Sequence, residues 1–269
     1  MRATPLATIS FVAVLASGTS RELAPNSRAW NAVTAPVKPT IVLVHGAFAD
    51  ATGWQELIPL LQQKYQVVAV QIPLSSLDDD IATARRLLDA QHGPVVLVGH
   101  SYGGAVITAA AVSNPNVKAL VYVAAFAPDA GEPLGSLQKN YAPPPLAATL
   151  RPDAAGFLYI DTAKFHEVFA QDLPLQKTRV MAVTQKPLSN TVFDATIKEA
   201  AWHTVPSWYL VAENDHAINP DLERFYARRM KAHTTEVPSS HVMFISHPAE
   251  VARVIDAAAN ETLKATAAR

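Results

Sequence analysis

The sequence predicts an α/β fold, with a mostly parallel central sheet, helices on both faces and one long segment that interrupts the strand order. Short apolar runs without polar alternation, typical of strands buried on both faces, alternate with helical segments. These runs stop after residue 125 and return only at residue 207. A length of 269 residues, 49% of them hydrophobic, suits one such domain with a large core.

The first half of the chain contains four of the predicted strands, at residues 40–45, 66–70, 94–98 and 117–125. Helices are expected between them, because this alternation is the pattern of right-handed parallel β-α-β units. They cover residues 54–63, residues 78–91 and a stretch that ends near residue 113. The acidic run at residues 78–80 is interpreted as a helix cap and first turn, where carboxylates complement the helix dipole.

The strand pattern is lost between residues 128 and 203. This segment is rich in proline, contains short helix-like pieces such as residues 162–170, and has no buried strand in our reading. We interpret it as a cap inserted between two parts of one core, residues 39–127 and 204–269. The second part is expected to hold strands at 207–212 and 234–237 and helices at 220–231 and 248–264.

The N-terminus resembles a secretory signal peptide over residues 1–18. Arg2 precedes an apolar run over residues 6–15, and small residues follow up to Gly18. The run is too short to span a bilayer, which takes about 20 residues, so no integral membrane span is predicted. Residues 19–38 are interpreted as a linker. We therefore expect a periplasmic or secreted protein, or a cytoplasmic one if the segment is not a signal.

Composition excludes several classes of function. The net charge is −1 and Lys or Arg runs are absent, so nucleic acid is not an expected partner. The chain has no cysteine, which excludes disulfides, a thiolate nucleophile and cysteine-bound zinc. A small molecule is the partner that we expect, and the sequence leaves the oligomeric state open.

The strongest chemical signal is the G-x-S-x-G motif at residues 99–103, placed between a buried strand and a helix. A nucleophile in such a tight turn has strained backbone geometry, and Gly99 and Gly103 leave room where side chains would collide. The turn also places Ser101 at a helix N-terminus, where free N–H groups favour negative charge. Ser101 is therefore the predicted nucleophile.

A serine hydroxyl needs a base, and the chain has nine histidines. His241 is predicted because it follows a strand and precedes the last helix, at the sheet edge where such folds build sites. His247 is the nearest rival. Asp215, which follows the strand at 207–212, is the predicted acid, with Asp129 as the fallback and Glu213 expected to point elsewhere. The chain order Ser, Asp, His is the one expected for this motif.

Developing negative charge requires preorganised N–H donors. One should be the backbone N–H of Tyr102, directly after the nucleophile. The other should come from the loop after the first strand, with Ala47 as the first choice and Phe48 as the alternative. Gly46 would permit a turn tight enough to aim an amide at the site. An ordinary β-α turn without this role stays open as the alternative for this loop.

Five segments together resemble a known family: VLVHGAFADATGW, PVVLVGHSYGG, ALVYVAAFAPDAGE, YLVAENDHAI and SSHVMFISHP. They are similar to α/β-hydrolase superfamily esterases of the pyrethroid-hydrolase-like and plant methylesterase-like branch, over about residues 39–262. The resemblance implies an α/β-hydrolase fold with a helical cap after strand 6 in that family's count, the fourth strand here. It also implies a carboxylesterase with neither cofactor nor metal.

The resulting prediction is serine-dependent hydrolysis of a carboxylic ester, small to medium and hydrophobic, through an acyl-enzyme. The alternatives are a small-molecule receptor or a non-hydrolytic lyase on the same fold. Related hydroxynitrile lyases carry lysine after the base and threonine at the HG glycine, where this chain has Val242 and Gly46. The substrate pocket is expected to draw on apolar or aromatic residues such as Phe126, Phe157, Tyr159, Phe165, Phe169 and Trp202.

Overall fold

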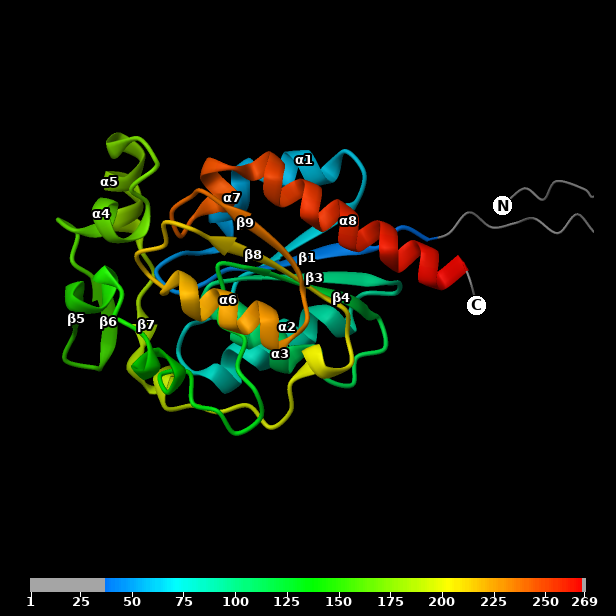
Figure 1. Cartoon of the computed structure of the whole chain (residues 1–269), viewed down its shortest axis with the longest axis horizontal. Helices are drawn as coiled ribbons and strands as arrows, with labels where there is room; N and C mark the ends of the chain where they lie inside the picture. Colours follow the sequence, from blue (N-terminus) through cyan, green and yellow to red (C-terminus); the bar gives the residue numbers. More distant parts are fainter. Residues whose placement is uncertain (1–36, 268–269) are drawn as a thin grey trace, which may run out of the picture. The chain divides into compact units, whose positions relative to one another are not determined.

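The computed structural model describes residues 37–267, with side chains described up to residue 264. The predicted signal peptide, residues 1–18, and nearly all of the predicted linker lie outside the described residues, so both stay predictions. Figure 1 shows the described part as a sheet between helices, with a cap at one end. In this part of the chain, no helix has both the length and the apolar character needed to cross a membrane.

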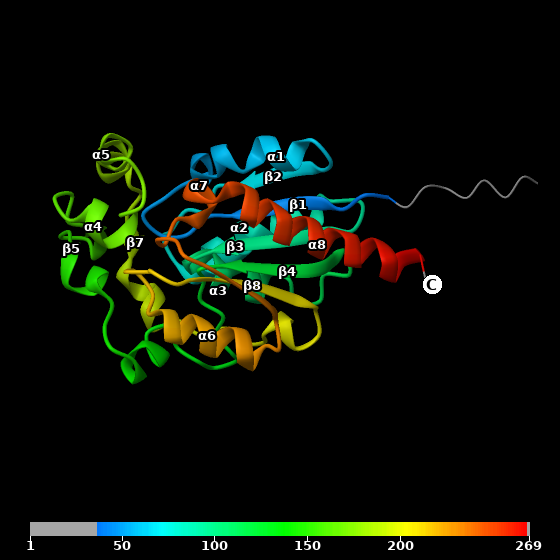
Figure 2. The ribbon, with the colours of Figure 1, turned by 45° about the horizontal axis from the view of Figure 1, so that its top comes forward.

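The central sheet has six strands in the order β2-β1-β3-β4-β8-β9, and every neighbouring pair is parallel (Figure 2). This confirms the predicted α/β-hydrolase fold class. The strands are β1 Thr40–Val44, β2 Gln66–Val70, β3 Val95–His100, β4 Val117–Val123, β8 Ser207–Ala212 and β9 His233–Val237.

Position in the sheet explains the strand sequences. Every residue of β1, β3 and β8 is buried, and their sequences are the uninterrupted apolar runs expected when helices cover both faces. The edge strands β2 and β9 are mostly exposed or half-buried. Their sequences, QVVAV and HTTEV, accordingly admit polar residues.

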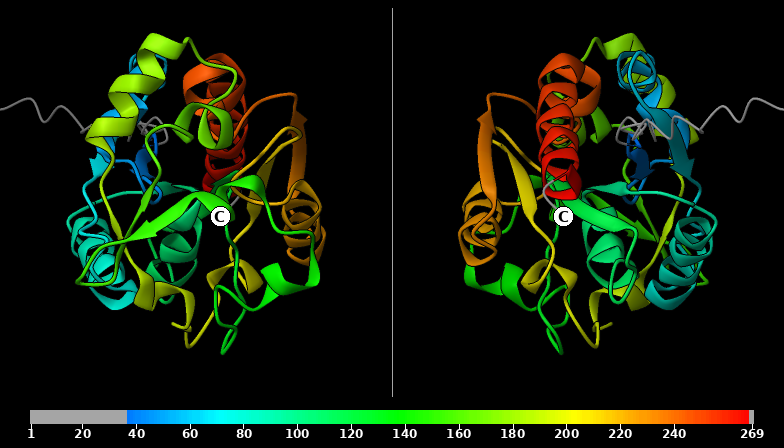
Figure 3. Two further views of the ribbon diagram at one scale, coloured as in Figure 1. Left: turned by 90° about the vertical axis from the view of Figure 1, so that its left-hand side faces the viewer. Right: turned by 90° about the vertical axis from the view of Figure 1, so that its right-hand side faces the viewer.

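Helices cover both faces of the sheet, with α1 and α8 on one side and α2, α3 and α6 on the other (Figures 1 and 3). The acidic run lies in the first turn of α2 as predicted, and Ser76 is the N-cap. The helices are α1 Ile58–Gln62, α2 Leu77–Asp89, α3 Tyr102–Ala110, α6 Pro220–Arg229, α7 Met243–Ser246 and α8 Pro248–Ala267, with a 3-10 turn at Ala51–Glu56 before α1.

The segment between β4 and β8 covers the end of the sheet where the strands stop (Figure 1). It contains α4 Phe165–Phe169 and α5 Leu175–Thr184. No buried strand was expected in it, and the strands that the structure forms there are short and mostly half-buried or exposed. Three short antiparallel strands pair in the order β5-β6-β7. Each has only two to four residues, too few to give a recognisable apolar run. They are β5 Leu150–Pro152, β6 Phe157–Ile160 and β7 Leu188–Ser189.

Candidate active site

Ser101 occupies the turn between β3 and α3 with a φ of +52°, in the left-handed region that a serine rarely adopts. The flanking glycines make this turn possible. A Cβ on Gly99 would lie 2.6 Å from the carbonyl oxygen of Gly103, and a Cβ on Gly103 would lie 2.6 Å from that of His45. The predicted reason for these two glycines is therefore confirmed.

Backbone hydrogen bonds hold the strained serine in place. The Ser101 N–H donates to the carbonyl of Val123 at 3.1 Å. The Ser101 carbonyl accepts from Gly104 at 2.9 Å and from Phe126 at 3.0 Å. Since β4 and the residues after it supply two of these contacts, the neighbouring strand fixes the turn. The surrounding structure thus maintains a backbone conformation that is unfavourable by itself.

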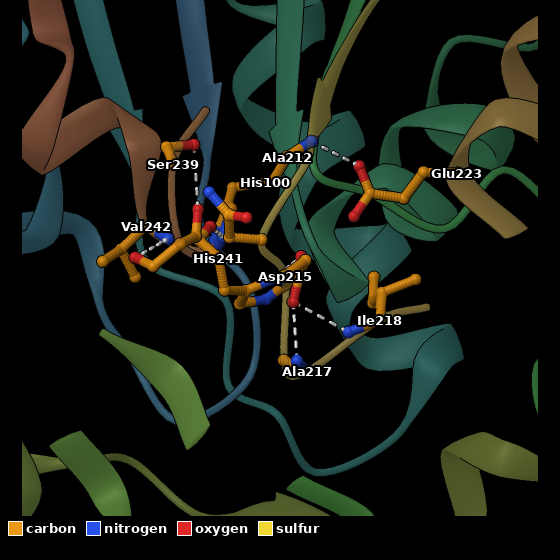
Figure 4. A network of polar contacts seen from close by, with 12 residues as sticks. His100, Ala212, Asp215, Ala217, Ile218, Glu223, Ser239, His241 and Val242 are labelled. Carbon is orange, nitrogen blue, oxygen red and sulfur yellow. Dashed lines mark hydrogen bonds and ion pairs between the residues drawn. The ribbon is translucent and has the colours of Figure 1, made fainter. Parts of the chain in front are cut away.

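His241 and Asp215 meet through a buried hydrogen bond (Figure 4). Nδ1–H of His241 donates to Oδ2 of Asp215 at 2.5 Å, and the two side chains are 1% and 0% exposed. Oδ1 of Asp215 accepts from the N–H groups of Ala217 at 2.6 Å and Ile218 at 2.9 Å. Burial alone would raise the pKa of Asp215, but the neighbouring imidazole and these hydrogen bonds keep it below its ordinary value.

The free nitrogen of His241 belongs to the same cavity wall as Ser101. Since Nδ1 carries the hydrogen shared with Asp215, Nε2 presents a lone pair. Nε2 is buried and has no hydrogen-bond partner in the part of the chain that the structure describes. Ser101 and His241 both line one cavity beneath the cap. The structure therefore brings a hydroxyl and an unengaged imidazole nitrogen to the same space.

Two further histidines, His45 and His100, shape the surrounding loops. Nε2–H of His100 donates to the backbone carbonyl of His241 at 3.0 Å, and burial lowers the pKa of His100 well below its ordinary value. His45 donates from Nδ1 to the carbonyl of Gly46 at 2.8 Å and accepts from the N–H of Ile72 at 3.2 Å. Burial lowers the pKa of His45 to about 4. Both rings are therefore neutral spacers.

The rival residues have other partners. The fallback acid, Asp129, accepts from Nε2 of His203 at 2.9 Å on the protein surface. His247 shares a hydrogen bond with the hydroxyl of its neighbour Ser246 at 2.8 Å. Glu213 is exposed. Among the candidate acids, Asp215 is the one that contacts His241.

The predicted oxyanion donors also lie at the cavity. Ala47, Phe48 and Tyr102 all line it, and within residues 37–267 their backbone N–H groups have no hydrogen-bond acceptor. Phe48 has a φ of +58°. A Cβ on Gly46 would lie 2.6 Å from Cβ of Ser101, so only glycine lets this loop approach the serine so closely. Ala47 and Phe48 both have the position predicted for the second donor.

The cavity has a volume of about 70 Å³ and a mostly apolar wall. Two of the aromatic candidates, Phe126 and Phe169, line it, whereas Phe157, Tyr159, Phe165 and Trp202 do not. The aliphatic residues of the wall were not predicted, because nothing in the sequence distinguishes an aliphatic residue that lines a cavity from one in the core of the cap. The cap residues of the wall are Leu134, Gln138, Pro144, Leu146, Ala147, Leu150, Phe169, Leu188, Val192 and Phe193.

Two acidic residues around the site were not predicted. Asp172 of the cap accepts from the N–H of Ser240 at 2.9 Å and from its hydroxyl at 2.6 Å, directly before His241 in the chain. Glu223 belongs to α6, and its side chain lies beside that of Asp215. Helical periodicity could have identified Glu223, because it places a carboxyl on the buried face of α6. Asp172 gave no such signal.

The polar groups around the cavity point to acid-base and nucleophilic chemistry. Among residues 37–267, no cluster of three or more His, Asp or Glu side chains is arranged to hold a metal ion. What the site offers is a hydroxyl on a strained turn, an imidazole oriented by a carboxylate, and backbone N–H groups at a helix N-terminus. Such groups can transfer an acyl group and stabilise the oxyanion that forms on the way.

Comparison with known sequences gives a consistent picture. Residues 41–254 match the profile of the family described as "Alpha/beta hydrolase family". The chain is 27% identical over 252 residues to alpha/beta hydrolase nvfD of Aspergillus novofumigatus, covering 85% of this chain and 99% of that protein. It is 27% identical over 216 residues to methylesterase 8 of Arabidopsis thaliana, covering 70% of this chain and 77% of the relative.

Comparison with solved structures places the fold. A pyrethroid hydrolase from Sphingobium faniae superposes with a TM-score of 0.70 at 22% identity, over 82% of this chain and 97% of that one. At this identity the likeness concerns the fold. The described residues therefore share the overall fold of that hydrolase.

Proposed function

The chain belongs to the alpha/beta hydrolase family, and from this premise we propose that it hydrolyses carboxylic esters with Ser101 as nucleophile. The observation that carries the proposal is the buried bond between Asp215 and His241, which leaves Nε2 of His241 unpaired in the cavity that Ser101 also lines. The esterases among its relatives support ester hydrolysis in general.

In the proposed mechanism, Ser101 attacks the ester carbonyl while Nε2 of His241 takes the hydroxyl proton. Asp215 stabilises the imidazolium that forms and keeps its ring oriented. The N–H groups of Tyr102 and Ala47 donate to the oxyanion, which collapses as His241 returns the proton to the departing alcohol. A water molecule, deprotonated by His241, then attacks the acyl-enzyme and releases the carboxylic acid.

The cavity supports a small hydrophobic ester as substrate. Its volume of about 70 Å³ is well below the roughly 300–1,000 Å³ typical of clefts that hold drug-sized ligands. Its wall is apolar except for a few groups such as Gln138, so a charged acyl group would be desolvated without a partner. We therefore propose that the substrate has a short aliphatic acyl group, which binds in this cavity under the cap.

The same geometry makes a lyase of the hydroxynitrile type a weaker proposal. The Val242 side chain after the base is buried and cannot supply a positive charge. A threonine at position 46 would place its Cβ 2.6 Å from Cβ of Ser101, so the turn could not accept it without moving. A measurement of turnover distinguishes hydrolysis from a receptor role, because a receptor would bind the ester without cleaving it.

The test is Ser101→Ala, assayed on p-nitrophenyl acetate and butyrate beside the wild type. We expect kcat to fall by roughly 10⁴-fold or more, because no other group in the site can form the acyl-enzyme. A fluorophosphonate probe should label the wild type and not the variant. Ser75→Ala, which removes a hydroxyl bonded to Asp79 at the surface, should keep full activity. Turnover in Ser101→Ala near the wild-type rate would refute the mechanism, and a wild type without turnover would favour a receptor.

A further inference from the structure

Among the described residues, the mechanism above leaves two fully buried acids, Asp80 and Glu223, without a role. Both oxygens of Asp80 have donors, the N–H of Leu74 and the hydroxyl of Tyr102. Glu223 lies on α6 with an exposed fraction of 0%, on the same face as Leu222, Tyr226 and Ala227. That face packs against the sheet and would ordinarily be apolar. Burying a carboxyl there costs free energy unless its atoms find hydrogen-bond partners, so its contacts indicate its role.

One oxygen of Glu223 has a backbone partner. Oε2 accepts from the N–H of Ala212, the last residue of β8, at 2.9 Å (Figure 4). Oε1 has no N–H or hydroxyl donor in the described residues. The side chain of Asp215 lies within hydrogen-bonding reach of the Glu223 side chain. Two carboxyl groups can share a hydrogen bond only if one of them carries a proton.

The surroundings decide which of the two acids is protonated. Burial and the charge of Asp215 raise the pKa of Glu223 well above its ordinary value, and the N–H of Ala212 and the charge of Arg224 oppose this less strongly. Tyr209 on β8 also faces Glu223 and is neutral, since burial raises its pKa well above the usual range. Asp215, with His241 as its partner, has a lowered pKa. The proton therefore belongs to Glu223.

We propose that Glu223 is a positioning residue of the active site, which donates a hydrogen bond to Asp215 and so holds that carboxylate where it accepts from His241. This inference rests on the proposed function. The same side chain also accepts from the N–H of Ala212, so it contacts the loop after β8 both at its start and at Asp215. A protonated carboxyl supplies a donor without adding a second negative charge beside Asp215.

The first experiment tests for the proton in Glu223→Gln, whose amide can accept from Ala212 and donate to Asp215. In the wild type, folding takes up a proton above the ordinary glutamate pKa of 4.5. Wild-type stability must then fall relative to the variant as pH rises from 5.5 to 8. We expect the ratio of the wild-type to the variant unfolding constant, from urea titrations, to rise with pH, by at most about tenfold per pH unit. Parallel stability curves would overturn the inference.

The second experiment tests for positioning in Glu223→Met, which fills a similar volume but has no donor. We expect kcat to fall by about 10- to 100-fold with little change in KM, while Glu223→Gln stays within about threefold of the wild type. The downfield proton resonance of Nδ1–H of His241 should move in Glu223→Met and stay in place in Glu223→Gln. Leu222→Ala, on the same buried face, controls for loosened packing and should lower stability without lowering kcat.

The outcomes separate this inference from the proposed function. Wild-type kcat in a folded Glu223→Met, or equal damage from the Gln and Met substitutions, would overturn the positioning role and leave the serine mechanism standing. If Ser101→Ala stays active, the serine mechanism fails, whereas the unfolding and resonance measurements still report on the contact with Asp215. If Glu223→Met does not fold, the pH dependence of Glu223→Gln decides the matter alone.

Discussion

The loops that end the strands and the cap build opposite walls of one cavity, but by different means. Ser101, Asp215 and His241 each follow a strand of the central sheet, are almost fully buried, and are held by hydrogen bonds to backbone or to one another. The cap contributes mostly aliphatic side chains from short helices and strands. The rigid sheet thus fixes the reacting groups, while the cap sets the size of the space.

Among the described residues, all of the large apolar side chains that are exposed belong to the cap, except Val37. Leu175, Val180 and Val183 on α5 are 49%, 59% and 75% exposed. The strands β1, β3 and β8 contain no exposed residue. A cap held by fewer buried contacts can open at lower cost in free energy than the sheet can deform. The comparison predicts that substitutions at the sheet edge change kcat, whereas substitutions in the cap change substrate preference.

The largest effect in this comparison is expected for Asp215→Asn. The amide can present its N–H to His241, which favours the tautomer that carries the proton on Nε2 and so removes the base. We expect kcat to fall by roughly 10⁴-fold, as for the same change in serine proteases. Asp129→Asn, at the exposed ion pair with His203, is the matched control and should stay near the wild type. If Asp215→Asn lowers kcat less than Asp129→Asn does, Asp129 becomes the better candidate for the acid.

The site residues at the sheet edge were largely predictable, because the local sequence determines the strands and the turn that carry them. Fully buried strands need continuous apolar runs, and the turn at Ser101 needs glycine at positions 99 and 103. Placement at the end of a parallel strand then singled out Asp215 and His241. The role of Glu223 was not predicted, because it depends on a contact between α6 and the loop after β8, and residue spacing alone does not show such a contact.

The cap was less predictable for a physical reason. Its strands β5 and β7 have three and two residues, so pairing within the cap, not side-chain pattern, forms them. The prediction emphasised aromatic residues, yet the cavity wall is mostly aliphatic. Leu146 lines the cavity and Leu173 does not, although both are 8% exposed. Which leucine faces the substrate depends on tertiary packing.

A smaller effect, on preference, is expected for Leu146→Ala. Removing this side chain enlarges the space near Ser101, and each additional buried methylene of an acyl chain gains about 0.8 kcal/mol. We expect the ratio of kcat/KM for p-nitrophenyl hexanoate over acetate to rise by about 10-fold, with kcat for acetate changed little. Leu173→Ala creates a comparable void in the cap core and should leave the ratio unchanged. Equal ratios in the two variants would mean that the cap does not determine acyl length.

The smallest effect is expected where the two regions touch. Asp172 of the cap accepts from the N–H and the hydroxyl of Ser240, so Asp172→Ala leaves two buried donors beside His241 without their acceptor. Water can reach the exposed Asp172, which limits the loss to about 1 kcal/mol, or about 3- to 10-fold in kcat.

Asp161→Ala, which breaks contacts within the cap alone, is the control for Asp172→Ala and should keep kcat. If Asp172→Ala alters acyl-length preference and leaves kcat intact, the contact orients the cap and not the base. In that case the contact between Asp172 and Ser240 would position the cap only, and the loop after β9 would hold His241 in place without the cap. A fall in kcat with preference unchanged would instead assign Asp172 to the support of the base, making it the one part of the cap that acts with the sheet edge.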